Sequence, residues 1–171
     1  MKRLFLSCVV AATIFATFAV PAQAANAPLM CPPPVPGQAT SCTLHLTDFS
    51  PPPMTVKAIV CPDGSVVPSG SLASTFETGV FHITINGAGD LWLTTTVQGT
   101  FTFTAAPSGT VYTGHFMQWF GTEANNMNFV TLGNLTYVGT SASGALLNLH
   151  LVFHLSISAS GQVNFFMNAT C

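Results

Sequence analysis

The feature that most constrains the fold is a two-residue alternation of side-chain character over residues 91–104. The odd positions are mostly apolar, whereas every even position from Thr94 to Thr104 is threonine or glutamine. Successive side chains of a strand point to opposite faces of its sheet, so this pattern indicates a long strand with one buried and one solvent-exposed face. Residues 145–157 repeat the pattern, with mostly leucine at the odd positions and with His150 and His154 on the other face.

Further runs of β-branched and aromatic residues are separated by short groups of Gly, Ser, Asn, Asp and Pro, which is typical of hairpins. We expect strands at 43–49, 54–60, 79–86, 91–105, 110–120, 127–139, 144–158 and 162–169, with a loop at 62–74. No segment combines helical periodicity with capping residues. The pattern predicts an all-β protein, an antiparallel up-and-down barrel of about eight strands, because closure removes exposed edges. A two-sheet β-sandwich is the alternative.

The first 24 residues read as a secretory signal peptide: Lys2 and Arg3 precede an apolar run, and Ala22 and Ala24 precede the expected cleavage point. The apolar run is shorter than the roughly 20 residues that span a bilayer, so no transmembrane anchor is expected. Residues 25–41 are rich in proline and form an extended leader, and residues 42–171 form a single β domain. We therefore expect a secreted, extracellular protein.

Four cysteines remain after the signal peptide: Cys31, Cys42, Cys61 and Cys171. An even number in an exported domain indicates two disulfides, for which three connectivities are possible. We favour Cys31 with Cys42, which closes a local proline-rich loop. Cys61 would then pair with Cys171 and fasten the last strand to the rest of the domain.

Charge is scarce after residue 24, where Lys57 is the single basic residue against five carboxylates, giving a net charge of −4 with histidine neutral. A protein that binds nucleic acid neutralises several phosphates with Lys and Arg, so nucleic-acid binding is excluded. The chain also lacks a phosphate-binding loop, a nucleophile motif and a metal-ligand spacing, and no cofactor is expected.

Five histidines stand out among so few charged groups, at positions 45, 82, 115, 150 and 154. His150 and His154 share a strand face, but four residues at about 3.3 Å each separate them by roughly 13 Å. They cannot share one metal ion, whose nitrogen ligands lie about 2 Å away. We interpret the histidines as solvent-facing, and no metal site is assigned.

The densest polar and aromatic stretch contains Tyr112-Thr-Gly-His-Phe116, Trp119-Phe-Gly121, Asn125 and Asn128. This pattern resembles a group of uncharacterised secreted β-rich proteins from actinobacteria and related soil bacteria, over about residues 78–171. The chain differs from the group at Met127, where arginine is usual, and in carrying less charge. The resemblance implies a bacterial secreted protein and brings no known activity.

The same stretch supplies the candidate ligand-binding residues, because an aromatic ring beside amide groups suits sugars or small polar ligands. They are His115, Trp119, Glu123, Asn125 and Asn128, placed at the expected barrel mouth. The leading hypothesis is a non-enzymatic protein that binds a small ligand or a cell-surface component. One alternative is a hydrolase-type extracellular enzyme using His115 and Glu123 as acid and base, and another is a purely structural exoprotein.

Overall fold

The computed structural model describes residues 31, 35 and 37–171. The expected signal peptide and most of the proline-rich leader lie outside the described residues. Within the described part the regular secondary structure consists of strands. No helix in it is long and apolar enough to cross a membrane.

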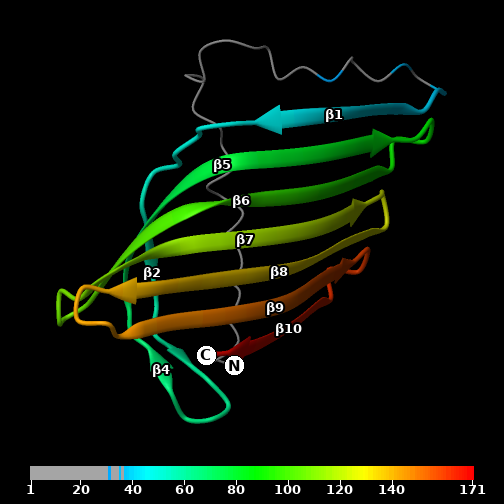
Figure 1. Cartoon of the computed structure of the whole chain (residues 1–171). Coiled ribbons are helices and arrows are strands. Elements are labelled where there is room, and N and C mark those ends of the chain that lie inside the picture. The colour runs from blue at the N-terminus through cyan, green and yellow to red at the C-terminus, as the bar shows by residue number, and fades with distance from the viewer. Residues whose placement is uncertain (1–30, 32–34, 36) are drawn as a thin grey trace.

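Most of the strands form one antiparallel sheet in the order β1-β5-β6-β7-β8-β9-β10 (Figure 1), and β2 pairs with the first part of β5. A separate small hairpin is made by β3 and β4. The strands are β1 (Thr40–Leu46), β2 (Met54–Val56), β3 (Ile59–Val60), β4 (Val66–Val67), β5 (Gly70–Ile85), β6 (Leu91–Ala105), β7 (Val111–Ala124), β8 (Asn128–Ser141), β9 (Leu146–Ser158) and β10 (Val163–Thr170).

The sheet is open, so the expected barrel is not formed. Closure would require β1 to pair with β10, but within the described part of the chain β1 pairs with β5 and β10 with β9. The two edge strands have 7 and 8 residues, about half the length of the central strands. The sandwich alternative is not formed either, since the second sheet is only the β3–β4 hairpin. All-β structure with antiparallel neighbours joined by hairpins is confirmed.

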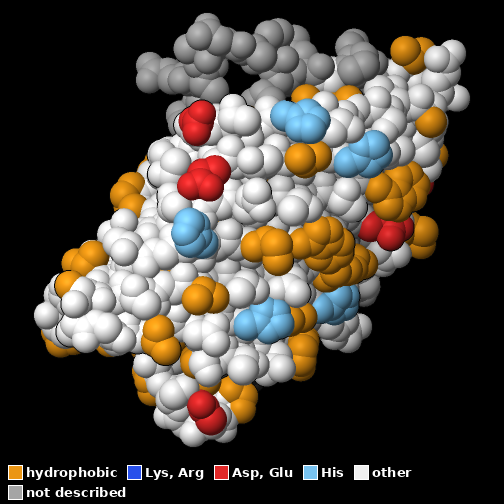
Figure 2. All heavy atoms as spheres, viewed as in Figure 1, with side chains coloured by type: hydrophobic (Ala, Val, Ile, Leu, Met, Phe, Trp, Pro, Cys, Tyr) orange, Lys and Arg blue, Asp and Glu red, His pale blue; other side chains and the backbone are white. Residues whose placement is uncertain are grey.

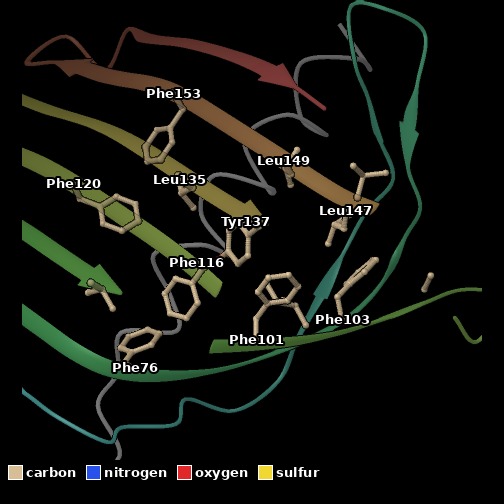
Figure 3. Packing of buried hydrophobic residues seen from close by; sticks show 14 residues of the cluster. Phe76, Phe101, Phe103, Phe116, Phe120, Leu135, Tyr137, Leu147, Leu149 and Phe153 are labelled. Carbon is tan, nitrogen blue, oxygen red and sulfur yellow. The ribbon is translucent and has the colours of Figure 1, made fainter. Parts of the chain in front are cut away.

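The two-residue alternation is confirmed, because buried and exposed side chains alternate along β6 and along most of β9. One side of the sheet, here called the core face, carries an apolar cluster from β5 to β9 (Figure 3). The other side, here called the outer face, carries most of the threonines and amides and the histidines. Phe120 and Phe153 lie over Gly133, where a Cβ would meet both rings.

The segment between β1 and β5 covers part of the core face, because Phe49, Val56 and Ile59 pack against the cluster and Val67 belongs to it. Figure 1 shows this connection behind the sheet. Pro51, Pro52 and Pro53 precede β2, and proline lacks the backbone N–H that a central strand needs. This segment thus takes the place of a second sheet.

Both expected cysteine pairs are confirmed. Cys31 lies with Cys42 of β1, with Cα atoms 5.6 Å apart, and Cys61 lies with Cys171, with Cα atoms 5.9 Å apart. Each separation falls in the range that a disulfide spans. Cys61 is buried and directly follows β3, so its bond ties the end of β10 to the cover of the core face.

Tyr137 is the polar member of the core cluster. Its ring stacks on Phe116 with centroids 5.6 Å apart, and the Gln118 side-chain amide donates a hydrogen bond to its hydroxyl. Burial raises the pKa of Tyr137 to about 12, and the bond from Gln118 offsets part of that rise. The phenol therefore stays protonated in the folded protein at pH values where an unfolded tyrosine ionises.

Stability is expected to fall with rising pH above about 10. In the unfolded chain the Tyr137 phenol ionises near its ordinary pKa of 10.0, whereas the folded protein retains the proton up to about 12. Unfolding then releases a proton, so the unfolding free energy falls by about 1.4 kcal/mol per pH unit between these values. Urea unfolding at pH 9 to 12 measures this slope. Tyr137→Phe should flatten it; an unchanged slope would contradict the assignment.

Candidate functional site

The outer face is built by the pairing register of six neighbouring strands. Side chains directly opposite one another on adjacent strands lie on the same face, about 5 Å apart. One row across the sheet consists of Val80, Thr96, Trp119, Asn134, Val152 and Asn168. In Figure 2 hydrophobic side chains gather near the centre of this face, with histidines around them, and no Lys or Arg is visible. No basic group is therefore visible on this face, whereas the register places the acidic Glu123 on it, opposite Trp92.

Trp119 lies on this open face rather than at a barrel mouth. Its ring edge covers Gly121, since a Cβ built on that glycine would lie 3.0 Å from the indole Cη2 and 3.4 Å from Cζ2. The ring therefore lies along the strand instead of projecting from it, and the absence of a side chain at Gly121 makes the room. Trp119 remains 38% exposed. The result is an accessible aromatic ring whose edge is packed against the sheet.

Three further apolar side chains extend this surface. Met117 precedes Trp119 by two residues on the same face, Leu132 lies opposite Gly121, and Val152 lies opposite Asn134. These three side chains and Trp119 are all exposed. We call these residues the Trp119 patch: Met117, Trp119, Leu132 and Val152. Exposed contiguous apolar patches of this kind mark interaction sites more often than scattered single residues do.

Polar groups border the Trp119 patch on the same rows. Thr96 and Asn134 lie directly opposite Trp119 on the two neighbouring strands. His150 Nε2 donates a hydrogen bond to Asn134 Oδ1 over 2.8 Å, which orients the amide and leaves its NH2 group as a donor. A flat ring flanked by a hydroxyl and an oriented amide can stack on a ring and hydrogen-bond to its substituents.

Glu123, Asn125 and Asn128 come together at the β7–β8 turn, where they line a depression of about 220 Å³ with Ser156 and Asn164 among its other residues. Asn125 Oδ1 accepts hydrogen bonds from the backbone N–H groups of Met127 and Asn128. The carbonyl of Asn125 is therefore occupied by the turn itself, as is usual for asparagine in tight turns. Trp119 does not line this depression.

His115 lines a different and larger depression of about 630 Å³, at the other end of β7. Its floor and walls include the hydroxyl-bearing Thr75, Thr100, Thr113 and Thr140. His115 and Glu123 are eight residues apart on one strand, or about 26 Å. The five expected site residues are thus divided over three places, and His115 and Glu123 are too far apart to act on one bond.

The histidines lie on the outer face, as expected, but apart from one another. His82 sits between the hydroxyls of Thr43, 3.0 Å from its Nδ1, and Ser41, 3.4 Å from its Nε2. His150 is engaged with Asn134. Over residues 37–171 no three His, Cys, Asp or Glu side chains are grouped so that they could hold a metal ion.

Sequence reasoning identified Trp119 but missed the residues that lie beside it. Leu132, Asn134 and Val152 belong to other strands, and only the pairing register brings them next to the indole. Met117 could have been predicted from the sequence, because it lies two residues before Trp119 on one strand and side chains two residues apart point to the same face.

Comparison with known proteins adds no relative to this description. No protein-family model matches the chain, and neither a curated protein nor a solved structure is significantly similar to it.

Proposed function

We propose that this chain is a secreted, non-enzymatic protein that binds a neutral glycan of the extracellular environment through the Trp119 patch. The observation that carries the proposal is the indole of Trp119, whose ring edge lies over Gly121 and which is 38% exposed between Thr96 and Asn134. Exposed aromatic rings can stack on the apolar faces of sugar rings. Two disulfides support an oxidising, extracellular setting.

The charge distribution favours a neutral ligand. After residue 24, Lys57 is the single basic residue, so an acidic polysaccharide would find no cluster of partners. The nearest acidic residue along β7 is Glu123, four residues or about 13 Å from Trp119. Hydroxyl and amide groups at Thr96 and Asn134 instead match the uncharged hydroxyls of a sugar chain.

An open face also favours an extended chain over a small molecule. Small-molecule sites are concave and bury most of the ligand. The Trp119 patch spans β7, β8 and β9 on an exposed sheet surface, so a polymer can lie across several strands. The proposal therefore concerns a surface component or a polysaccharide, and the separation of His115 from Glu123 gives no support to turnover of it.

Replacing Trp119 by alanine is expected to lower the affinity for the bound polysaccharide at least about tenfold, which corresponds to about 1.4 kcal/mol. The measurement is depletion of the protein by insoluble cellulose, chitin, starch and β-1,3-glucan, each at several protein concentrations. Because Trp119 is on the surface, the fold should survive, and circular dichroism checks it.

Trp92 offers a matched control for this experiment. It is the same side chain on the same face, 39% exposed against 38% for Trp119, but it lies opposite Glu123 and outside the patch. Trp92→Ala should leave binding within about twofold. Failure of the unmodified protein to bind any of these glycans, or equal losses for both variants, would reject the proposal.

A further inference from the structure

Among the described residues the sheet ends at β10, an edge strand that pairs with β9 on one side and with no strand on the other. In the β9–β10 turn, the Ser158 N–H donates to the Gln162 carbonyl. Along an antiparallel pair, hydrogen-bonded and non-hydrogen-bonded residues alternate. The even residues of β10 therefore bond to β9, and the N–H and C=O groups of Val163, Phe165, Met167 and Ala169 point away from the sheet.

Nothing in the composition of β10 discourages another strand from adding to this edge. Natural edge strands are commonly guarded by charged residues, proline or a bulge. Val163–Thr170 contains no charged residue and no proline, and its pairing with β9 is continuous. Phe165 and Met167 are exposed on the core face and Phe166, at 59%, on the outer face. The core face of the edge is thus apolar, and the outer face carries Phe166 between Asn164 and Asn168.

The opposite edge of the sheet is different. Cys42, in the middle of β1, is bonded to Cys31 of the leader. The leader also approaches the β5–β6 turn, where a Cβ built on Gly87 would lie 2.8 Å from the Gly37 carbonyl group. The intervening sequence includes Pro32, Pro33, Pro34 and Pro36, which lack the N–H that strand pairing uses. Leader residues therefore lie beside the β1 edge, whereas residues 163–168 of the β10 edge are exposed and Ala169 near its end is buried.

We infer that β10 pairs antiparallel with β10 of a second copy of this chain, forming a two-fold symmetric dimer with one sheet running through both subunits. The outward backbone groups belong to odd residues, so odd residues must form the hydrogen-bonded pairs. A two-fold axis at Phe166 satisfies this. It sets Phe165 of each copy opposite Met167 of the other and Val163 opposite Ala169.

The side chains of β10 match one another in this register. Phe166 of one copy meets Phe166 of the other in a non-hydrogen-bonded pair, where Cα atoms are about 4.5 Å apart and side chains are closest. Asn164 faces Asn168 of the second copy, and two amides can bond reciprocally. An uncharged edge gives no like-charge repulsion between identical chains. Assembly stops at two copies because the two-fold contact uses the β10 edge of both copies.

Sedimentation velocity over a range of concentrations tests the dimer with the processed protein. We expect a monomer–dimer equilibrium in which Phe166→Lys raises the dissociation constant at least tenfold, since it places two ammonium groups opposite each other at the axis. The matched control is Val138→Lys, at an outer-face position of β8 that is 52% exposed and two strands from the edge. It should leave the dissociation constant unchanged.

Cysteine substitution tests the register independently. Phe166→Cys should give a covalent dimer on oxidation, because about 4.5 Å between Cα atoms suits a disulfide. Asn164→Cys and Asn168→Cys should cross-link poorly alone and well when mixed, and Val138→Cys should not cross-link. A monomer at every concentration, larger open assemblies, or equal cross-linking of all four variants would overturn the inference. Trp119→Ala should still dimerise, so a failure of glycan binding is distinguishable from a failure here.

Discussion

Replacing Gly99 by alanine is expected to prevent stable folding. A Cβ at this position would overlap the backbone carbonyl oxygen of Thr75 on the neighbouring strand and lie 3.0 Å from the Glu77 N–H nitrogen. The pairing of β5 with β6 shifts by one residue here, between Phe76 and Thr78. The bulged segment of β5 thus crosses directly over Gly99, and backbone atoms cannot yield as a flexible side-chain end can.

The expected loss is more than about 4 kcal/mol of unfolding free energy, which is a large part of the stability of a domain. Gly99 lies in the middle of the longest ladder of the sheet, so displacing β5 also displaces Phe76 from the core cluster. Urea unfolding of the purified variant measures the loss, and recovery only as insoluble protein would agree with it.

Gly144 provides the control. It lies in the β8–β9 turn at φ +82°, and a Cβ there would meet no atom within 4 Å. Gly144→Ala should cost only the left-handed backbone strain, about 1–2 kcal/mol. Similar losses at the two glycines would mean that the close approach of β5 to Gly99 is not what constrains that position.

Removing the Cys61–Cys171 disulfide is expected to have the second largest effect. It joins residues 110 apart in sequence, whereas Cys31–Cys42 joins residues 11 apart. Cross-linking a longer loop removes more conformational freedom from the unfolded chain, which predicts losses of about 5 and about 3 kcal/mol, respectively. The Cys61–Cys171 bond also holds the end of β10 against the segment that covers the core face, so its removal should loosen both the end of β10 and that segment.

Paired substitutions Cys61→Ala with Cys171→Ala, and Cys31→Ala with Cys42→Ala, allow the comparison without leaving a free thiol. Thermal and urea unfolding of both double variants should rank the first as the less stable. If the Cys31–Cys42 variant loses as much or more, the contribution of that bond would come from fastening the leader to β1 rather than from loop length.

Alternation predicted the central strands closely. The expected 91–105 strand is β6, and four others differ from β7 to β10 by a few residues at their ends. These segments are long, most apolar positions of β6 and β9 keep a single parity, and short turns containing Gly, Ser or Asn separate them. Under those conditions local side-chain pattern and tertiary burial agree, so the sequence is sufficient.

The expected loop at 62–74 is wrong in its last part, because β5 begins at Gly70 rather than at residue 79. Residues 70–78 are mostly small or polar and their alternation is broken by the bulge between Phe76 and Thr78. They form a strand because the long β6 offers them backbone partners. The expected strand 54–60 is two strands, β2 and β3, which end up in different sheets.

In the candidate site, too, the sequence predicted the residue type but not which residues lie together. Trp119 was selected from residue type and neighbouring sequence, and it is accessible on the outer face. His115 and Glu123 were grouped with it because they are near in sequence, but a strand separates residues by about 3.3 Å each and so spreads such a group apart. Residues that share a site on a sheet come from different strands.

What the sequence determined by itself is which side chains share a face and which cysteines are available to bond, since both depend on chain geometry and composition alone. Tertiary structure decided which strands are neighbours, that the sheet stays open, which residues surround Trp119, and that β10 is left unguarded at an edge. Pairing joins segments tens of residues apart, and its register depends on bulges and covering loops that no local pattern encodes.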